Sequence, residues 1–482
     1  MGLELIETDV LALNNNWWLR NDGNYLVLYK LSANESIAIP LPPPLSVFVA
    51  LLGEGIPLKK LFEEINFVFQ LNSLQKARAF VNSGVDFLTS KNEIIIKNES
   101  PQRIRRFSPS KYYLPMNHYQ IPLDSRLSRP THIRLSIGSL CQTDCVYCYA
   151  EKLYISKKSR LSYNRWIELI DEAIENEVLN IEVSGADPFA DDICPRVTSY
   201  ILESEIPVFL STKALISPKI LDELIEAGLN HTINSRSSLI QISVDSVEPD
   251  IADKLTGVKD YLIRADENVR LCVNRGVRVR IKTVLTKKNH DAILPIIEKY
   301  YSLGIRFFQF VQCGRSYFRN NEDFMLLASQ KQQIAAINES IDKNKYPDAE
   351  IIIQNEKGTG VESFSPEEWL NRPRCSGGYS SMTICPDGNV ILCEQLPANA
   401  EYIVGNVKKN SFLSIWNSER LKKWLQPPLS AFRGTPCFDC EEFIQCVHNA
   451  GWCYRDALFA YGRMHTAPPR CPRQETQARR LL

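Results

Sequence analysis

Short apolar runs alternate with amphipathic helical stretches from Thr131 onward. The strand candidates are THIRLSI, NIEVSG, PVFLST, LIQISVDS, RVRIKTVLT and RFFQFVQ, separated by helical stretches such as YNRWIELIDEAIENEV and SPKILDELIEAG. In the second helix, Ser217 suits the N-cap and Pro218 the first helical position. Six strands with helical crossovers predict an α/β fold over residues 131–345, a parallel sheet or partial (β/α)6 barrel. Chemistry in such folds gathers at the C-terminal ends of the strands.

The first hundred residues follow a different pattern. The stretch WWLRNDGNYLVLYKL alternates and is rich in aromatic residues, with a turn at residues 21–24, so it predicts a β-hairpin. Helical patterns follow at residues 45–52, 57–66 and 74–88, and NEIIIK predicts a further strand. We therefore expect a small winged-helix-like α+β module over residues 1–100. Residues 101–130 are basic and interrupted by prolines, which predicts a linker.

The alternation is predicted to stop near Tyr346. SMTICPDGNVILCEQ indicates a hairpin with its turn at residues 386–389, and the rest of residues 346–482 is rich in loops and cysteines. A region with so little apolar periodicity is expected to need metal ligation to hold its shape.

Length and charge narrow the class of protein. A chain of 482 residues is long enough for about three domains. It has 56 basic and 56 acidic residues, so it lacks the basic excess of a protein that neutralises nucleic-acid phosphates. The apolar run LSVFVALL is too short to span a bilayer, and the N-terminus does not resemble a signal peptide. We predict a cytoplasmic protein that binds neither nucleic acid nor membrane.

The distribution of the 14 cysteines is the strongest chemical signal. None lies in the first 140 residues, and eight lie between Cys375 and Cys471. Three fall in CQTDCVYCYA, directly after the first predicted strand of the sheet: Cys141, Cys145 and Cys148. Three thiolates this close can hold an iron–sulfur cube and leave its fourth iron open. The alternatives are a zinc site that lacks a fourth ligand, or reduced core cysteines.

This CxxxCxxC motif, with the aromatic Tyr147 before its last cysteine, resembles the signature of the radical S-adenosylmethionine (SAM) family. SGADP, which follows the second strand, resembles that family's GGEP motif, which binds the SAM amino group. Its candidate SAM contacts are Ser184, Gly185, Ala186 and Asp187, although Ala186 and Asp187 replace a glycine and a glutamate. Ser211 at the end of the third strand, and Ser243 and Asp245 at the end of the fourth, resemble family contacts to the SAM carboxylate or ribose. The resemblance implies that a 5′-deoxyadenosyl radical abstracts a hydrogen from the substrate, with the protein positioning the cofactor.

The C-terminal cysteines resemble the SPASM extension of peptide- and protein-modifying radical SAM enzymes. That extension usually holds two auxiliary 4Fe-4S clusters, which would give three clusters in this chain. By resemblance, one auxiliary cluster is held by Cys437, Cys440, Cys446 and Cys471. The other has three ligands, Cys375, Cys393 and Cys453. Its fourth position is either an open iron or Cys385, and the spacing of Cys385 to Cys393 across the turn favours the open iron. A pair of structural zinc sites is the alternative for these cysteines.

The N-terminal module resembles the peptide-recognition element of ribosomal-peptide maturases, through its hairpin, the helix that ends near Gly53 and Gly55, and PLKKLFEEI. Such elements bind a leader peptide as an added strand at a sheet edge. A DNA-binding winged helix is the competing interpretation, which the zero net charge disfavours.

These resemblances together predict an oxidoreductase that crosslinks a ribosomally made precursor peptide. The crosslink would be a thioether or a carbon–carbon bond, and auxiliary clusters could take the second electron. The leader would bind residues 1–100, and a reduced flavodoxin or ferredoxin would supply electrons. One alternative is a peptide epimerase that uses the Cys313 thiol as hydrogen donor, although such a cysteine is more often a buried apolar residue. The others are a maturase of the anaerobic sulfatase-activating kind and a zinc-stabilised peptide-binding protein.

Overall fold

The computed structural model divides the chain into two compact units, Met1–Ser128 and Arg129–Leu482, and each is described by itself. It describes residues 6–14, 17–23, 25–31, 36–89, 94–97, 109–115, 118–120, 126–151, 155–233, 236–341, 344–354, 364–372, 374–449 and 453–474. Among these residues, no helix combines the length and the apolar character needed to cross a membrane.

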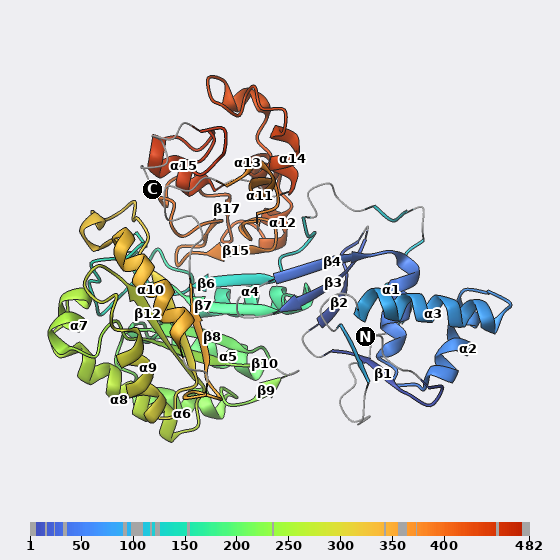
Figure 1. Ribbon diagram of the computed structural model, residues 1–482, viewed down its shortest axis with the longest axis horizontal. Helices are drawn as coiled ribbons and strands as arrows, with labels where there is room; N and C mark the ends of the chain where they lie inside the picture. The colour runs from blue at the N-terminus through green and yellow to red at the C-terminus, as the bar shows by residue number, and fades with distance from the viewer. Residues whose placement is uncertain are drawn as a thin grey trace. The chain divides into compact units, whose positions relative to one another are not determined.

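The first unit is an α+β structure. Three antiparallel strands form its sheet in the order β2 (Trp17–Asn21), β3 (Leu26–Leu31) and β4 (Ser36–Leu41). Its helices are α1 (Pro43–Leu52), α2 (Leu58–Val68) and α3 (Leu74–Thr89), and β1 (Leu11–Leu13) pairs with β5 (Ile95–Lys97). The hairpin and the three helices predicted from the sequence are present (Figure 1). Strand β4 was not predicted separately, and Asn24 of the predicted turn lies outside the described residues.

Part of the segment predicted as a linker packs inside this unit. Tyr112 and Leu114 are buried in its hydrophobic core, and residues Pro109–Tyr112 form a 3-10 turn, η2, that contacts α1. Asp22 forms a buried ion pair with Arg20 and also accepts a hydrogen bond from the backbone NH of Ser128. The described part of residues 109–128 is thus packed structure. Residues 101–108, 116–117 and 121–125 lie outside the description.

The second unit is built on one ten-stranded mixed sheet. Its strands run in the order β14-β13-β12-β11-β8-β7-β6-β15-β16-β17. The central six are the six predicted strands, and they are parallel: β6 (His132–Ser136), β7 (Asn180–Ser184), β8 (Val208–Thr212), β11 (Leu239–Ser243), β12 (Val279–Leu285) and β13 (Phe307–Gln312). The predicted α/β class is therefore confirmed.

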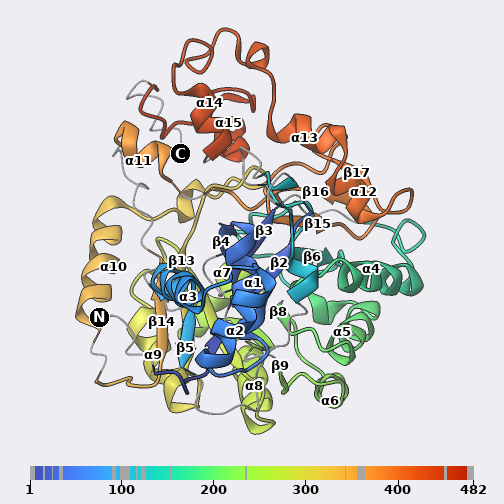
Figure 2. The ribbon, with the colours of Figure 1, turned by 90° about the vertical axis from the view of Figure 1, so that its right-hand side faces the viewer.

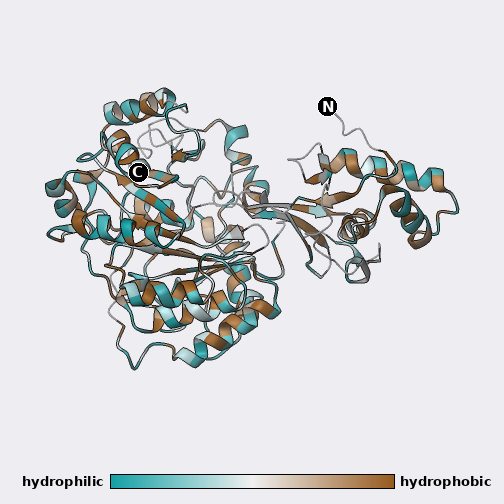
Figure 3. Ribbon diagram, turned by 90° about the horizontal axis from the view of Figure 1, so that it is seen from below, coloured by the Kyte–Doolittle hydropathy of each residue, from teal (hydrophilic) through white to brown (hydrophobic). Residues whose placement is uncertain are grey.

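Crossover helices cover one face of this sheet. They are α4 (Tyr163–Glu175), α5 (Ile193–Glu203), α6 (Pro218–Glu226), α7 (Pro249–Thr256), α8 (Tyr261–Asn274) and α9 (Ile293–Ser302). Figure 2 shows α4, α5, α6, α8 and α9 in an arc around the strands, and Figure 3 shows hydrophobic and hydrophilic positions interleaved along these helices. Ser162 caps α4 by accepting a hydrogen bond from the backbone NH of Arg165, and Pro218 begins α6 as predicted.

The alternation extends past the predicted boundary at residue 345. Helix α10 (Ala328–Ser340) is followed by β14 (Glu350–Ile353), which pairs in parallel with β13. At the other side of the sheet, β15 (Ser381–Ile384) pairs in parallel with β6. The C-terminal region therefore shares its sheet with the predicted barrel.

The cysteine-rich C-terminal region consists of short elements. The predicted hairpin is formed by β15 and β16 (Asn389–Ile391), and β17 (Gly405–Asn406) pairs with β16. The helices are α11 (Pro366–Leu370), α12 (Phe412–Trp416), α13 (Glu419–Leu425), α14 (Phe443–Asn449) and α15 (Tyr454–Tyr461). Among the described residues of the unit, 3-10 turns lie at η4 (Pro188–Ala190), η5 (Glu322–Phe324) and η6 (Leu429–Phe432), and β9 (Thr232–Ile233) pairs with β10 (Arg236–Ser237).

Candidate functional site

The CxxxCxxC motif forms a loop directly after β6, where its backbone is fixed to α7. The backbone NH groups of Asp144 and Val146 donate hydrogen bonds to the carbonyls of Thr256 and Leu255, at 2.8 and 3.0 Å. The sulfurs of Cys141 and Cys145 both lie 3.4 Å from the Thr143 hydroxyl oxygen. Cys148 lies close enough to Cys145 for its charge to raise the Cys145 pKa, although burial of Cys145 is the larger cause. The three thiols therefore converge on one region of the loop, as a shared cluster requires.

A buried network lies beside this loop and holds Tyr147. The Tyr147 hydroxyl donates a hydrogen bond to the Asp245 carboxylate, which is wholly buried and also accepts from Lys213 Nζ at 3.0 Å. Asp245 Oδ1 accepts from the backbone NH of Val284 at 3.0 Å. Burial and the Asp245 charge raise the pKa of Tyr147 far above its ordinary value, so the phenol stays protonated. The network joins the ends of β8 and β11 to the cysteine loop.

The loop after β7 has a backbone shaped for close approach. Gly185 has φ +91°, and a Cβ atom at this position would lie 2.2 Å from Ser136 Oγ and 2.8 Å from its Cα. Ala186 also has a positive φ, of 25°. Only glycine fits at residue 185, because any side chain would collide with the end of β6.

Asp187 is buried, and both oxygens of its carboxylate accept hydrogen bonds from neighbouring protein groups. Oδ1 accepts from Thr212 Oγ1 at 2.7 Å and from the backbone NH of Phe189 at 3.1 Å. Oδ2 accepts from the backbone NH groups of Lys213 and Ala214 at 2.7 and 2.9 Å. The SAM contact that the motif predicts for this side chain stays a prediction. With four hydrogen bonds it ties the β7 loop to the end of β8.

Ser211 and Ser243 lie on the face of the sheet that the helices leave uncovered. Ser211 Oγ accepts a hydrogen bond from Gln241 Nε2 at 2.7 Å, and the Ser243 carbonyl accepts from the Tyr261 hydroxyl at 2.5 Å. Gln241 is held in turn by Arg280, whose guanidinium donates two hydrogen bonds to Gln241 Oε1.

This uncovered face is polar and partly accessible to solvent. Along β6, β7, β8 and β12, residues alternate strictly between buried and half-buried. The buried set packs under the helices, and the half-buried set faces the other way. Lys282 on β12 belongs to the half-buried set, and no hydrogen bond or ion pair with the described residues holds its side-chain ammonium. Burial and the neighbouring Arg280 lower its pKa.

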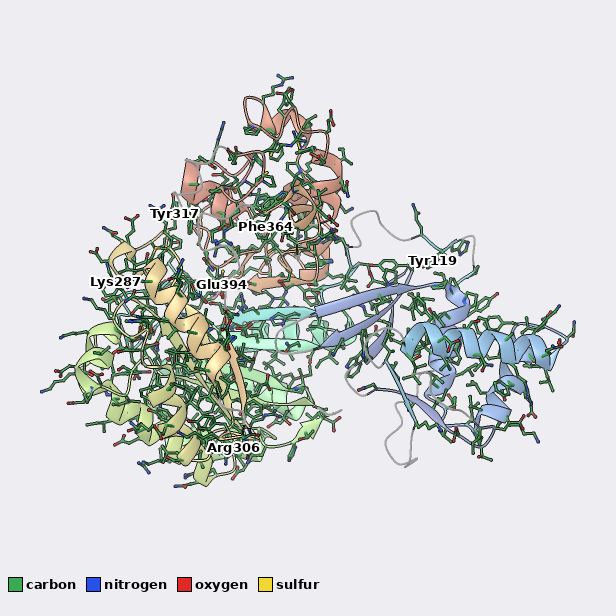
Figure 4. All side chains as sticks on the ribbon, viewed as in Figure 1. Tyr119, Lys287, Arg306, Tyr317, Phe364 and Glu394 are labelled. Carbon is green, nitrogen blue, oxygen red and sulfur yellow. The ribbon has the colours of Figure 1, made fainter. Side chains whose placement is uncertain are left out.

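A chain of charged residues on this face continues into the C-terminal region. Arg134 on β6 forms ion pairs with Glu182 on β7 at 2.8 Å and with Glu394, just after Cys393, at 3.1 Å. Glu394 also accepts hydrogen bonds from Tyr149 at 3.3 Å and from Ser184 at 3.4 Å (Glu394 is labelled in Figure 4). Glu394 therefore links the cysteine loop, the β7 loop and one of the C-terminal cysteines.

Cys313 follows β13 and belongs to the same small apolar cluster as Cys145 and Tyr147. It is 6% exposed, and its sulfur accepts a hydrogen bond from Asn321 Nδ2 at 3.6 Å. Burial raises its pKa to about 11, so it is a neutral thiol at ordinary pH. Cys194 and Cys272 are buried in the hydrophobic core beneath the sheet.

Four C-terminal cysteines line one pocket of about 60 Å³, which is more room than a single water needs. They are Cys437, Cys440, Cys446 and Cys471. Burial is the largest cause that raises the Cys437 pKa to about 12, and the charges of the other three thiols add to it. This is the grouping that the sequence resemblance implied for one cluster.

Three further cysteines form a second group. Cys375 lies close enough to Cys393 and to Cys453 for its charge to raise the pKa of each, in addition to burial. Cys385 lies on the β15–β16 turn, where its backbone pairs with Asn389. After burial, the causes that raise its pKa are the carboxylates of Asp387 and Glu394, with no cysteine among them. The surroundings of Cys385 therefore do not favour it as a fourth ligand.

Among the described residues, no three His, Cys, Asp or Glu side chains gather around a point that could hold one metal ion. The fit to iron–sulfur clusters rests on the grouping of the cysteines, because a cluster distributes its ligands over several irons.

Comparison with known proteins assigns the two parts of the second unit. Residues 135–300 match the family model described as the radical SAM superfamily, and residues 375–441 match the SPASM model, described as an iron-sulfur cluster-binding domain. The chain therefore carries a radical SAM domain and a SPASM domain. The domains predicted from the cysteine motifs are thereby confirmed, and they imply SAM and 4Fe-4S clusters as cofactors.

Two relatives of the radical SAM–SPASM region carry functional names. A PqqA peptide cyclase of Ruegeria pomeroyi is 26% identical over 341 residues, which cover 69% of this chain and 84% of that protein. The antilisterial bacteriocin subtilosin biosynthesis protein AlbA of Bacillus subtilis is 22% identical over 350 residues, which cover 70% of this chain and 73% of the relative.

A solved structure extends the likeness to nearly the whole chain. The crystal structure of Streptococcus suis SuiB bound to precursor peptide SuiA has a TM-score of 0.66, with 15% identity over 96% of this chain and all of that one. At this identity the match shows a shared fold only. Because it covers 96% of this chain, the shared fold extends to the N-terminal unit.

Two charged residues of the candidate site, Lys213 and Glu394, were missed from the sequence. Lys213 directly follows a predicted strand, so its place beside Ser211 at the strand end was a usable signal. Glu394 had no such signal, because its contacts with Arg134 and Tyr149 join residues far apart in the chain.

Proposed function

We propose that this radical SAM enzyme installs a crosslink, a thioether or a carbon–carbon bond, in a ribosomally made precursor peptide. The observation that carries the proposal is the combination of a radical SAM domain with a SPASM domain in this chain, whose relatives include a PqqA peptide cyclase and a subtilosin biosynthesis protein. Forming one such bond removes two hydrogens from the peptide, one as a hydrogen atom and one as a proton and an electron.

The cysteine loop after β6 would hold the SAM-binding cluster through Cys141, Cys145 and Cys148. Together with SAM, this cluster supplies the 5′-deoxyadenosyl radical that abstracts the hydrogen atom. Around it, the chain provides the backbone of Gly185 and Ala186 and the side chains of Ser184, Ser211, Ser243 and Asp245 as contacts to SAM. Tyr147 and Lys213 fix Asp245 in place. The half-buried polar face of the sheet offers hydrogen-bonding groups to a peptide.

The SPASM domain would hold two further 4Fe-4S clusters, which gives three in all. The four-cysteine pocket suits one complete ligand set. The group of Cys375, Cys393 and Cys453 would hold the other with an open iron, because the surroundings of Cys385 do not favour it as fourth ligand. A reduced flavodoxin or ferredoxin in the cytoplasm would supply electrons.

The N-terminal unit would bind the leader of the precursor. Its sheet ends at β2 and β4, each of which pairs only with β3 among the described residues. A peptide can bind at the edge of a sheet as an additional strand. We therefore assign leader binding to residues 1–100.

One observation favours a second candidate, peptide epimerisation. The neutral thiol of Cys313 packs in the same cluster as Cys145 and Tyr147, next to the loop where the radical would form. A protonated thiol there could return a hydrogen atom to a peptide carbon. This reaction would leave the mass of the peptide unchanged in ordinary water.

The test begins with iron and sulfide content after anaerobic reconstitution. We expect about 12 irons per chain, which corresponds to three clusters, whereas about four would remove the SPASM assignment. The reconstituted enzyme is then incubated with SAM, dithionite and the peptide encoded by a short reading frame beside its gene. A crosslink predicts 5′-deoxyadenosine and a peptide lighter by two hydrogens. An unchanged mass in water, with uptake of deuterium from D2O, would instead establish epimerisation.

A further inference from the structure

Arg372 lies against the four-cysteine pocket of the SPASM domain. Its NH2 group donates a hydrogen bond to the sulfur of Cys446 at a distance of 3.5 Å. A positively charged donor therefore contacts one of the four sulfurs that line the pocket.

The position of this guanidinium is fixed by its own helix. Ser365 and Glu368 form a capping box that begins α11, and α11 contacts α14, the helix that carries Cys446. Near the end of α11, Trp369 is buried against Cys471, Cys437 and Cys446. The Arg372 guanidinium carbon stacks 3.7 Å above the centre of the Trp369 ring, and its NH1 group donates to the Trp369 carbonyl. Stacking and this hydrogen bond orient the planar group so that NH2 faces the sulfur.

Arg473, which lines the pocket, is paired with a carboxylate. Arg473 pairs with Glu442 at 2.7 Å, and Glu442 in turn accepts a hydrogen bond from Cys440 Sγ at 3.3 Å. Cys440 therefore faces a carboxylate, whereas Cys446 faces a cation. The electrostatic environment of the four sulfurs is asymmetric.

We propose that Arg372 raises the reduction potential of the cluster held by Cys437, Cys440, Cys446 and Cys471. The inference rests on the proposed function, which places a cluster in this pocket. Reduction adds one negative charge to a cluster and its thiolates. A hydrogen-bond donor and a positive charge beside a ligand sulfur stabilise the reduced form, so they raise the potential.

The position of Arg372 in the chain gives this effect a role in the reaction. Cys375, a member of the three-cysteine group, follows only three residues later. A higher potential at the four-cysteine site favours electron transfer to it from the three-cysteine site. Arg372 would act as a positioning residue that sets the direction in which the electron removed from the peptide travels.

The experiment compares potentials in the full-length chain. Cys141, Cys145 and Cys148 are replaced by alanine so that only the SPASM clusters contribute signals. In this background, Arg372→Met removes both the charge and the donors, and Arg372→Lys keeps the charge but loses the planar fork. Arg433→Met is the control, because Arg433 is an exposed arginine of the same domain. Iron and sulfide are counted first, and each cluster is then titrated by electron paramagnetic resonance, with Cys446→Ser used to assign the signals.

We expect Arg372→Met to lower the equilibrium constant for reduction of the four-cysteine cluster about tenfold, which is 59 mV for a one-electron couple. Arg372→Lys should show part of this shift, and Arg433→Met none. An unchanged potential in Arg372→Met with full iron content would overturn the inference, as would a shift confined to the other cluster. If Arg372→Met loses iron, the test rests on Arg372→Lys. An Arg372→Lys variant with full iron content and an unshifted potential of the four-cysteine cluster would reject the inference. Absence of SPASM iron in the parent chain would instead contradict the proposed function.

Discussion

Lys213 and Asp245 form an ion pair, with Nζ 3.0 Å from Oδ2, just beyond the ends of neighbouring strands β8 and β11. The Asp245 side chain is wholly buried and that of Lys213 is 13% exposed. Burial alone would lower the pKa of Lys213, but the Asp245 carboxylate and neighbouring groups raise it overall, so the Lys213 ammonium stays charged. The pair positions Asp245, a predicted SAM contact, which also accepts a hydrogen bond from Tyr147 of the cysteine loop.

Replacing Lys213 with methionine is expected to destabilise the radical SAM domain. Removal of one partner leaves a buried charge uncompensated, which costs about 3–5 kcal/mol. Chemical denaturation measures the loss in the free energy of unfolding. Lys219→Met is the control, because Lys219 is 86% exposed in its pair with Glu223 and should cost less than about 0.5 kcal/mol. Equal losses in the free energy of unfolding would show that the buried pair contributes no more to stability than the exposed one.

Glu182 should make the stability of this domain depend on acid. Burial would raise its pKa, but His132 and Arg134 outweigh burial and lower it to about 2. Because the folded-state pKa lies below the ordinary value of 4.5, the stabilisation is fully present above pH 4.5 and is lost as the pH falls towards 2. We expect Glu182→Gln to lower the free energy of unfolding by roughly 3 kcal/mol at neutral pH, a gap that closes as the pH falls. A gap that stays constant down to about pH 3 would contradict this assignment.

Gly185→Ala tests the close approach of the β7 loop to β6. A positive φ costs an alanine about 1 kcal/mol, and the collision with Ser136 adds roughly 1–3 kcal/mol. We expect a loss of both stability and SAM affinity, measured by denaturation and by calorimetric titration with SAM. Gly434→Ala is matched to it, since Gly434 also has a positive φ but no atom within 4 Å of an added Cβ. If both variants lose the same amount, the contact with Ser136 does not matter.

Cys385→Ser should leave the iron content unchanged. Its charged neighbours are carboxylates, whereas Cys453 lies close to Cys375. We expect Cys453→Ser to lose about four irons per chain in the same assay, because it removes one of three ligands. A similar loss in Cys385→Ser would establish it as the fourth ligand.

Cys313→Ala separates the two candidate reactions. A crosslinking enzyme should still form 5′-deoxyadenosine and a peptide that is lighter by two hydrogens, because Cys313 contributes only packing. An epimerase should lose the uptake of solvent deuterium into the peptide while still cleaving SAM. Mass spectrometry of the peptide after reaction in D2O gives both readings in one sample.

Local patterns in the sequence account for the elements that were predicted correctly. The six parallel strands are compact apolar runs, and the cysteine spacing identified both domains. Strand β14 was missed although Ile351–Ile353 form the same apolar run that predicts a strand in NEIIIK, because it lies beyond the predicted boundary at residue 345. Its parallel pairing with β13 extends the sheet past that boundary. The packing of Tyr112 in the core of the first unit was missed for a different reason, since prolines and basic residues around it indicate a linker and only the distant core reveals its partners.

The candidate site divides in the same way. Cysteines and strand-end residues were recognised because they occupy fixed positions in a motif. The four hydrogen bonds of Asp187 and the contacts of Glu394 depend on loops brought together by the sheet, which no local pattern encodes.

The pairing of β15 with β6 bears on how such enzymes can be recombined. Because β15 is the parallel neighbour of the first radical SAM strand, a chain cut near residue 345 would leave β6 as an open edge. Exposed edges of this kind promote aggregation. A chimaera that exchanges SPASM domains between relatives should therefore keep β15 with its own sheet and join the chains beyond Ile384. The shared sheet makes the two domains one folding unit.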